Sequence, residues 1–391
     1  MLELSELAPR VFQSEIRAMS VLCDAAGGVN LAQGICDTAV PAIVAAGAAR
    51  AIRDGNNIYT RLEGIDRLRR AIAAHVAQFS GRTVDPDRQL LVTSGATGAF
   101  HAATMALLNP GDEVIVFEPF YGYHLSTLQA VRAVPVIIRL ELPDWRLDLD
   151  AVRSAVTART RAMVINSPSN PSGKVFTRAE LEALADIARE FDLFVITDEM
   201  YEHFVYGGAR HLSAAAIDGM EERAVVISGF SKTFSVTGWR VGYLLADAKW
   251  IPSIGYFHDL LYVCAPAPLQ HGVADGLEKL EPAFYKGLAR EYETKRDLLL
   301  RALTEAGLTP HTPDGAYYIL AYAASIPGET GAEKARSLLR QTGIAAVAGR
   351  AFFASVPDER NRGEDLLRFC FAKKDEDLER ACQRLRGARN L

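Results

Sequence analysis

The sequence predicts an α/β protein whose middle part forms a mostly parallel sheet and whose last third forms a smaller α+β unit. Between residues 89 and 228, short β-rich runs alternate with amphipathic helical stretches, as expected for a parallel sheet that is covered on both faces. Beyond residue 282 strands are mixed with longer helical stretches, which indicates a second unit. A length of 391 residues suits two or three domains.

The central sheet is predicted from six strand-like runs with helical stretches between them. The predicted strands are Gln89–Thr93, Glu113–Phe117, Val134–Ile138, Ala162–Ile165, Leu193–Thr197 and Ala224–Ser228. The predicted helices are Gly98–Leu108, Tyr123–Val131, Leu149–Ala155 and Arg178–Phe191. Thr177 and Glu180 form a capping box, which predicts where the last of these helices begins.

The last third of the chain is predicted from four segments. They are a long charged helix over Pro282–Ala306, a strand over Gly315–Leu320, and helices over Thr330–Thr342 and Asp375–Arg386. The first forty residues have no strong hydrophobic period, so the sequence leaves open which unit they pack on.

Composition excludes several classes of function. The chain is 49% hydrophobic and 23% charged, like an ordinary globular protein. A net charge of -5 gives no basic surface for nucleic acid or for a membrane. Residues 1–10 do not read as a secretory signal, and no apolar run approaches the roughly 18 residues of a membrane span. We therefore expect a cytoplasmic protein with no nucleic-acid or membrane partner.

The five cysteines are odd in number and scattered, and no two of them form a CxxC pair. This spacing indicates neither a zinc site nor a disulfide framework. Reduced thiols in a cytosolic protein are the expected state, and no metal site is predicted.

Ligands of an open parallel sheet bind outside the carboxyl ends of its strands, so residues that follow strands are the first candidates for a site. Lys232 follows such a run, among the small, hydroxyl and aromatic residues of Ser228–Phe234. Poor solvation disfavours the ammonium form and lets the amine attack a carbonyl carbon. Taken alone, an ordinary surface lysine is the better interpretation.

Asp198 ends the strand-like run before it, and Tyr201 comes three residues later. On a helical turn these two side chains would face the same side. A carboxylate here could cap a helix or could pair with the ring nitrogen of a pyridine cofactor, and the two interpretations are compatible. The Tyr201 phenol could donate to a ring oxygen.

Two features could bind a phosphate. Thr93–Gly98 joins a strand to a helix, and Gly95, Ala96 and Thr97 there would let a phosphate approach the helix N-terminus. Many such turns are rich in glycine for packing alone. Arg240 lies in an apolar setting and offers a guanidinium fork to an anion, or to an unidentified acid in a structural ion pair.

Three further residues are weaker candidates. Asn170 lies in a strongly turned loop, and Tyr121 follows a strand, where it could stack on a flat ring or belong to the core. Arg368 lies inside a hydrophobic strand pattern, so it either pairs with protein or grips a substrate carboxylate. Because these residues follow successive strands, we expect them to form one pocket with Lys232.

The motifs resemble those of the class I/II aminotransferases of pyridoxal-phosphate (PLP) fold type I, nearest to the kynurenine, glutamine and aromatic aminotransferases. The resemblance runs from about Asn30 to the C-terminus. It rests on Ser231–Phe234 through Arg240–Gly242, on Asn170–Gly173 and on Asp198–Tyr201. It implies a large PLP-binding domain over 45–275 with a seven-stranded sheet, and a small domain made of 1–44 and 276–391.

The resemblance also implies roles for individual residues. Lys232 would hold the cofactor as a Schiff base and shuttle a proton, with Asp198 at the pyridine nitrogen and Tyr201 at the ring's 3′ oxygen. The implied cofactor-binding residues are Gly95, Ala96, Thr97, Tyr121, Asn170, Asp198, Tyr201, Ser231, Lys232 and Arg240, with Tyr59 reaching the phosphate of the neighbouring subunit in a homodimer. The implied substrate-binding residues are Gly34, Asn170 and Arg368.

Three positions depart from the family pattern. Many relatives have a hydroxyl residue three positions before the lysine, where this chain has Gly229, and Ser228 is a possible substitute. Asp66 replaces a common proline. The segment Gly34–Pro41 lacks the aromatic-proline pattern that lines the substrate pocket of relatives.

The expected function is transfer of an amino group from an amino acid to a 2-oxo acid, such as 2-oxoglutarate, by a ping-pong cycle. A PLP-dependent lyase that carries out C–S β-elimination is the alternative, because both reactions use the same carbanion. A transcriptional regulator would need a DNA-binding domain, which this chain lacks. Which amino acid is used stays open, and Arg61 is a candidate for a distal carboxylate by position only.

Overall fold

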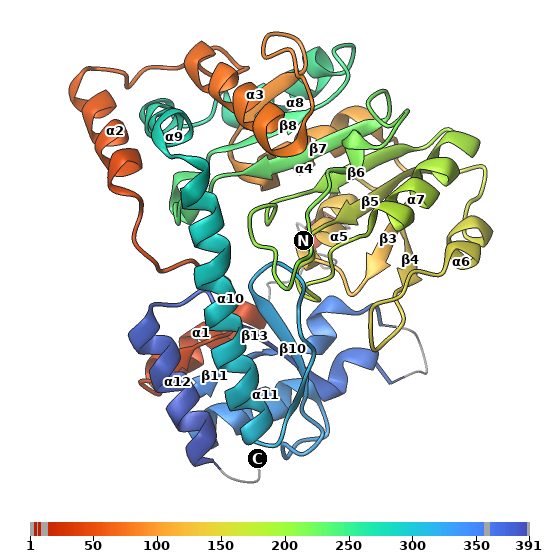
Figure 1. Cartoon of the computed structure of the whole chain (residues 1–391). Coiled ribbons are helices and arrows are strands. Elements are labelled where there is room, and N and C mark those ends of the chain that lie inside the picture. The colour runs from red at the N-terminus through yellow and green to blue at the C-terminus, as the bar shows by residue number, and fades with distance from the viewer. Residues whose placement is uncertain (1–3, 6, 9–14, 356–359, 389–391) are drawn as a thin grey trace.

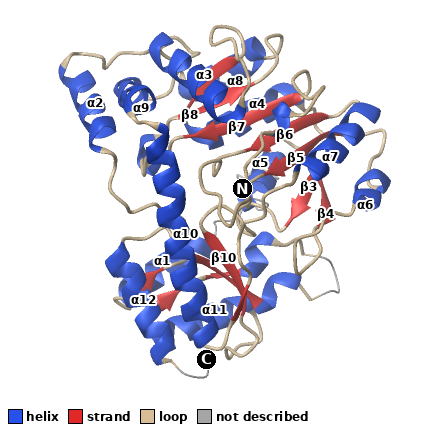
Figure 2. Ribbon diagram, in the orientation of Figure 1, coloured by secondary structure: helices blue, strands red, loops and turns tan. Residues whose placement is uncertain are grey.

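The computed structural model of the chain describes residues 4–5, 7–8, 15–355 and 360–388. Its centre is a seven-stranded sheet with the strand order β2-β8-β7-β6-β5-β3-β4 (Figures 1 and 2). The strands are β2 (Leu90–Thr93), β3 (Glu113–Glu118), β4 (Val134–Arg139), β5 (Thr160–Asn166), β6 (Phe194–Asp198), β7 (Ala224–Gly229) and β8 (Gly242–Leu245). All run in one direction except β8, which is antiparallel to both of its neighbours.

The predicted α/β class and mostly parallel sheet are confirmed, as are all six predicted strands. The one strand of this sheet that was not predicted as a separate run is β8, which lies directly after the Arg240 turn. It is as short as β2, but it begins with Gly242, and a glycine that follows a turn looks like a continuation of that turn. Its place between β2 and β7 nevertheless shapes the candidate site described below.

Helices cover both faces of this sheet, and successive residues of one strand point to opposite sides. On β3, Val114 and Val116 join the core beneath α4 (Gly95–Leu107), α5 (Gly122–Ala130) and α8 (Ile251–Tyr262). Ile115 and Phe117 of the same strand face the other core. That second core takes residues from α3 (Asp66–Ser80), α6 (Leu149–Ser154), α7 (Arg178–Glu190) and α9 (Ala267–Lys279). The period of two along a strand therefore separates the two helical layers.

The predicted capping box of α7 is confirmed, because Thr177 accepts the backbone N–H of Glu180 and the Glu180 carboxylate accepts that of Thr177. Helix α2 (Ala42–Arg53), which the sequence analysis did not predict, packs on α9 at one edge of the molecule (Figure 1).

The last third builds a separate four-stranded antiparallel sheet in the order β12-β13-β10-β9. Its strands are β9 (Thr309–Pro310), β10 (Tyr318–Tyr322), β12 (Val347–Ala348) and β13 (Leu366–Cys370). The helices around it are α10 (Pro282–Glu305), α11 (Gly331–Thr342) and α12 (Asp375–Gly387). In Figure 1, α10 runs from the level of the large sheet down to this second sheet.

The described part of the first forty residues packs on this second unit. Helix α1 (Glu15–Ala25) leads into β1 (Val29–Asn30), which pairs in parallel with β11 (Ile344–Ala345). The question that the sequence left open is thus answered by a pairing between segments more than 300 residues apart. Most of residues 1–14 lie outside the described part, so the absence of a signal sequence stays a prediction.

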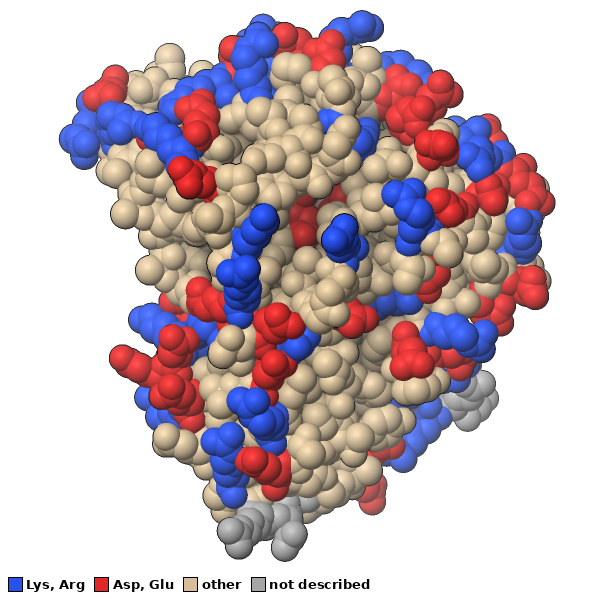
Figure 3. Space-filling view, viewed as in Figure 1, with Lys and Arg blue, Asp and Glu red and all other residues tan. Residues whose placement is uncertain are grey.

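Among the described residues, no helix is both long and apolar enough to cross a lipid bilayer. On the face shown in Figure 3, basic and acidic side chains are interspersed.

Candidate active site

Most of the predicted site residues lie beyond the carboxyl ends of the sheet strands. The first residue of β8 explains how segments far apart in the sequence meet there. Gly242 is paired with Thr93 at the end of β2 and with Gly229 at the end of β7. The turn before β8 is therefore held next to both the start of α4 and the loop that carries Lys232.

The N-terminus of α4 has features that could bind an anion. Its N-cap residue, Ser94, makes no side-chain capping hydrogen bond to the first turn. The Arg240 guanidinium lies against this turn, since a Cβ at Gly95 would be 2.5 Å from its terminal nitrogen. A Cβ at Gly242 would be 2.8 Å from the Ala96 nitrogen, so β8 can approach this closely only through glycine. Backbone N–H groups, a helix dipole and a guanidinium thus converge on one spot.

We call this possible phosphate site, formed by residues 94–97 and Arg240, the cradle, and two neighbouring side chains complete it. The backbone N–H of Ser94 donates to Nε2 of His258 at 2.9 Å, which fixes the turn before the helix. The Ser231 hydroxyl is buried and has no hydrogen-bond partner among the described residues. Thr97 is exposed at the same helix end. A phosphate in the cradle would give these two hydroxyls an acceptor.

Lys232 is half-buried between the two units. Its Nζ donates to the backbone oxygen of Gly34 at 2.9 Å and lies 5.5 Å from the centre of the Tyr317 ring. Burial lowers the pKa of this amine, and the guanidinium groups of Arg240 and Arg368 act in the same direction. The neutral form that a nucleophile requires is therefore easier to reach.

Asp198 ends β6 with its carboxylate held on two sides. Oδ2 is 2.9 Å from Nε2 of the buried His124, and Oδ1 accepts the backbone N–H of Met200 at 3.1 Å. The His124 ring in turn stacks at a tilt against Phe100, with 4.6 Å between ring centres. These two contacts limit the rotation of the carboxylate.

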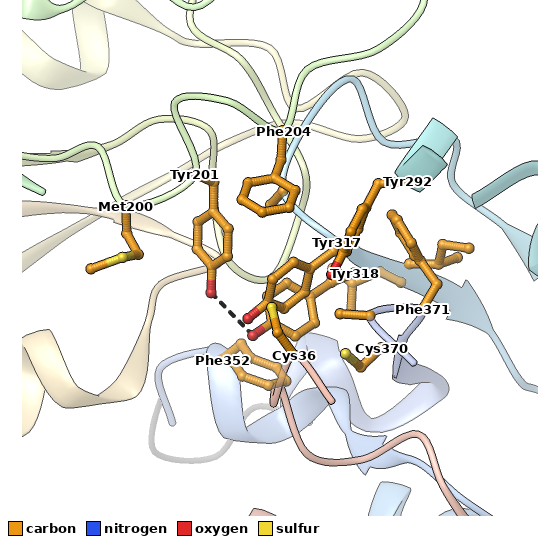
Figure 4. Packing of buried hydrophobic residues seen from close by; sticks show 14 of the residues in the cluster. Cys36, Met200, Tyr201, Phe204, Tyr292, Tyr317, Tyr318, Phe352, Cys370 and Phe371 are labelled. Atoms are coloured by element: carbon orange, nitrogen blue, oxygen red, sulfur yellow. Dashed lines mark hydrogen bonds between the residues drawn. The ribbon is translucent and has the colours of Figure 1, made fainter. Parts of the chain in front are cut away.

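Tyr201 and Tyr318 bring the two sheets into contact. Their hydroxyl oxygens are 3.1 Å apart (Figure 4). Burial raises the pKa of Tyr201 well above its ordinary value, and the Tyr318 phenol adds to the effect, so its hydroxyl stays protonated and can donate. Tyr121 lies half-buried nearby, where it stacks on Tyr123 at 5.3 Å and meets His124 edge-on at 5.2 Å.

Arg368 is fully buried on β13 and is held towards the site by both units. It donates to Oδ1 of Asn170 at 2.9 Å and to the backbone oxygen of Ala32 at 2.7 Å. The rings of Tyr318 and Phe352 flank its guanidinium at 4.3 Å and 4.7 Å. Its Nε is buried with no partner in the described part of the chain. An incoming carboxylate would satisfy this unused hydrogen-bonding capacity.

The structure does not bring two of the sequence candidates to this pocket within one chain. Tyr59 is 77% exposed. Arg61 is also exposed and pairs with Glu63 at 3.2 Å.

The suggestion that Ser228 replaces a missing hydroxyl is wrong. The Ser228 hydroxyl is buried and donates to Oε1 of Glu202 at 2.8 Å. The glycine at 229 has a packing reason, because a Cβ there would be 3.0 Å from Cα of Gly242. The close approach of β7 and β8 leaves little room for a hydroxyl side chain.

Sequence reasoning missed four residues that support the site: His124, His258, Tyr318 and Phe352. His124 follows Tyr121 by three residues at the start of a helix, so the helical period could have pointed to it. Tyr318 and Phe352 carry no local signal, since only the pairing of β10 with β13 brings Tyr318 next to Arg368.

The predicted residues therefore fit the cofactor that the motifs imply. The cradle at α4 suits its phosphate, the carboxylate of Asp198 suits its pyridine nitrogen, and the amine of Lys232 suits its aldehyde. The unpartnered Ser231 hydroxyl and Arg368 Nε are polar groups that a bound cofactor and substrate would satisfy.

Comparison with known proteins shows the family of the chain. Residues 26–385 match the family model described as aminotransferase class I and II. The chain is 34% identical to the methionine aminotransferase of Escherichia coli, over 98% of this chain and 97% of that one. It is 33% identical to the human kynurenine–oxoglutarate transaminase 3, over 90% and 83%.

Solved structures show the same fold. The N-succinyldiaminopimelate aminotransferase of Mycobacterium tuberculosis superimposes with a TM-score of 0.93 at 38% identity, over 99% of this chain and all of that one. The aspartate aminotransferase of Thermus thermophilus in complex with maleate gives a TM-score of 0.90 at 30% identity, with the same coverage.

Proposed function

Because the chain belongs to the class I and II aminotransferases, we propose that it moves the amino group of an L-amino acid to 2-oxoglutarate in a ping-pong cycle. Family membership carries the general activity, which is aminotransfer. The acceptor and the cycle are our inference, supported by a relative whose name includes oxoglutarate. The single observation that carries the proposal is the amine of Lys232, held between an anion cradle and the buried guanidinium of Arg368.

Bound PLP supplies an electron sink for the carbanion that forms when the substrate loses its Cα proton. We assign its phosphate to the backbone of Gly95, Ala96 and Thr97 with Ser231 and Arg240. Asp198 would keep the pyridine nitrogen protonated, and His124 would hold that carboxylate in place.

The ring of the cofactor would be fixed by three more residues. Tyr201 and Asn170 would donate to its 3′ oxygen, Tyr201 through a hydroxyl that burial keeps protonated. Tyr121 would stack on the ring face.

Lys232 would carry the proton that the reaction moves. In the neutral form, its Nζ can accept the proton from the substrate Cα, and the protonated amine can later return it. The backbone oxygen of Gly34 holds the amine at 2.9 Å, which keeps the side chain pointed into the pocket between these two steps.

Arg368 would bind the substrate α-carboxylate through charge-assisted hydrogen bonds, with help from Asn170 and the Gly34 backbone. Asn170 already accepts a hydrogen bond from this guanidinium, so it orients the fork before substrate arrives. This arrangement would place the Cα–H bond of the substrate next to Lys232 and away from bulk water.

We propose the domain division 45–275 against 1–44 with 276–391, because the two sheets fall on opposite sides of these limits.

We also propose a homodimer in which Tyr59 reaches the partner's phosphate. Tyr59 is exposed, and so is the apolar end of α8, including Tyr256, Leu260 and Leu261. That end adjoins the cradle, since Tyr262 is the nearest neighbour of a Cβ at Gly98. An exposed apolar patch of this kind is typical of a protein–protein interface, and a second subunit would bury it.

The variant Lys232→Ala tests the proposal, with Lys249→Ala as a control on an exposed lysine that pairs with Asp247. The first should lose the visible absorbance of the bound cofactor and nearly all turnover, while the control keeps both. Turnover by Lys232→Ala with the natural substrate would overturn the assignment.

A screen of the twenty common amino acids then names the donor. Conversion of the cofactor to its amino form, reversed by 2-oxoglutarate, supports aminotransfer. Release of ammonia and a thiol from a sulfur amino acid, with no amino form, would mean the lyase reaction instead.

A further inference from the structure

Away from the candidate active site, three side chains of metal-ligand type meet beside helix α3. His75 lies on α3, and Glu202 and His203 follow β6. One ligand atom of each lies within 4.8 Å of the other two. We propose that these three side chains bind one divalent transition-metal cation of the Zn²⁺ type.

The two imidazoles point the same ring nitrogen at each other. Nε2 of His75 and Nε2 of His203 are 2.9 Å apart. Two nitrogen ligands at about 2.0–2.1 Å from a tetrahedral zinc ion lie roughly 3.3 Å from each other. The rings therefore need to separate by only a few tenths of an ångström, within the reach of a small χ change.

The 2.9 Å contact is a hydrogen bond between the two rings, so without a metal ion one Nε2 donates and the other accepts. When both imidazoles carry their proton on Nδ1, both Nε2 atoms can offer a lone pair to the same ion.

Glu202 supplies the negative charge. Its Oε1 accepts hydrogen bonds from the Ser228 hydroxyl at 2.8 Å and from the Tyr243 hydroxyl at 3.2 Å. These two bonds fix the carboxylate, as the partners of metal-ligating carboxylates do. Within the described ranges, no lysine, arginine or histidine forms an ion pair with Glu202, whereas the neighbouring Glu199 pairs with His211 at 3.0 Å. A bound cation would pair directly with this carboxylate.

The hydroxyl of Tyr285, in the first turn of α10, is independent evidence that a hydrogen-bond acceptor belongs near this cluster. Its ring centre lies 4.6 Å from that of His203 and 5.2 Å from that of His75. The residue is 4% exposed, and its hydroxyl has no hydrogen-bond partner among the residues described. A buried phenol hydroxyl has one hydrogen bond to donate. A water molecule in the fourth position on the ion would accept that hydrogen bond.

The chemistry of the ligands selects the cation. Imidazole nitrogens suit zinc and its neighbours in the first transition row, whereas magnesium and calcium prefer an all-oxygen shell. The ring of Phe79 packs at 4.6 Å on His75 and at 4.9 Å on both His203 and Tyr285, which limits access of water.

The ion would join parts of the chain that are far apart in sequence. It would tie α3 to the segment after β6 and, through Tyr285, to the start of α10 (Figure 1). Because Glu202 directly follows Tyr201, the ion would also steady the segment that carries Asp198. Its role would be to stabilise the fold around the candidate site.

The test uses the holoenzyme, purified without a histidine tag and freed of metal with a chelator. Zn²⁺ is titrated in competition with a chromophoric chelator, and unfolding temperature is followed in parallel. We expect one ion per chain with a Kd of about 1 µM or tighter. At 100 times Kd the unfolding temperature should rise by about 3 °C. Mg²⁺ should have no effect.

Variants locate the site. His75→Gln, His203→Gln and Glu202→Gln should each weaken Zn²⁺ binding at least about 10-fold. His101→Gln, on α4 away from the cluster, is the matched control and should bind like the parent chain. Glu202→Gln can keep both hydrogen bonds to its Oε1, so it answers the question even where a histidine variant fails to fold. Binding that Glu202→Gln leaves unchanged, or no Zn²⁺ binding tighter than about 100 µM, would overturn the proposal.

Discussion

The half of the candidate site that we assign to the cofactor and the half that we assign to the substrate are built in different ways. The cofactor half consists of short segments that leave the strands of one sheet: Gly95 after β2, Asp198 at the end of β6 and Lys232 after β7. The substrate half is assembled across the molecule. Arg368 on β13 reaches Asn170, which is 198 positions away, and Ala32, which is 336 positions away.

This difference in construction separates binding of the cofactor from binding of the substrate. A sheet edge holds the cofactor residues rigidly, because each of them is fixed by strand pairing within a few positions. The substrate residues depend on how the second sheet and the segment around Gly34 sit against the first. Substitutions in the two halves should therefore fail in different ways, and this can be measured.

The largest effect should come from the cofactor half, in Asp198→Ala. Removing the carboxylate leaves the pyridine nitrogen without its partner, so kcat should fall by about 10³-fold. Steady-state kinetics at saturating cofactor would measure the fall. Asp192→Ala is the control, since that carboxylate is exposed and pairs with Arg223 at the surface. A kcat within a factor of three of the parent would contradict the assignment.

In the substrate half, Arg368→Ala should raise the KM for the amino acid by roughly 100-fold, because charge-assisted hydrogen bonds to the α-carboxylate are lost. The cofactor should remain bound, with its visible absorbance unchanged. Arg336→Ala, on the exposed face of α11, is the control. Loss of the cofactor from Arg368→Ala would mean that the two halves are not separate.

The same contrast explains what the sequence could predict. Lys232, Asp198 and Gly95 follow β-rich runs, so a strand pattern and one rule about strand ends place them at a common edge. The six strands predicted from the sequence were therefore sufficient to bring the residues of the cofactor half together. Strand β8 was missed because its four residues begin with a glycine directly after the Arg240 turn, although that residue, Gly242, joins the ends of β2 and β7.

Residues of the substrate half carried weaker signals. Arg368 stood out as a charge in an apolar strand, but Tyr318 and Phe352 look like ordinary core residues until the antiparallel pairing of β10 with β13 brings them beside it. The placement of β1 next to β11 also depends on a contact over the length of the chain, which no local period encodes.

A smaller effect should follow from His124→Phe, which removes the donor to Asp198 but keeps a ring against Phe100. We expect kcat to fall about 10-fold, the cost of one lost hydrogen bond to a buried carboxylate. His124 acts through Asp198, so the pH at which the bound cofactor changes its absorbance should shift as well. His124→Gln, which can still donate, should restore both properties, and a failure to do so would contradict a positioning role.

The smallest effect should appear in the pH dependence of stability at the phosphate cradle. His258 accepts the Ser94 N–H through Nε2, so its ring is neutral in the folded chain, and burial lowers its pKa from 6.5 to about 4. Between these two values the unfolded chain binds a proton that the folded chain does not. The free energy of unfolding therefore decreases as the pH falls through this window.

His258→Gln keeps an acceptor for Ser94 but does not titrate. Both chains should lose stability between about pH 6.5 and 5. The loss in free energy of unfolding should be smaller in the variant than in the parent chain, by up to about 2 kcal/mol. Urea denaturation at several pH values in this window would measure the difference, and other buried histidines cancel because both chains contain them. If the free energy of unfolding depends on pH equally in both chains, the hydrogen bond from Ser94 to His258 does not stabilise the cradle. The cradle would then be held by backbone contacts within a few positions of each strand end.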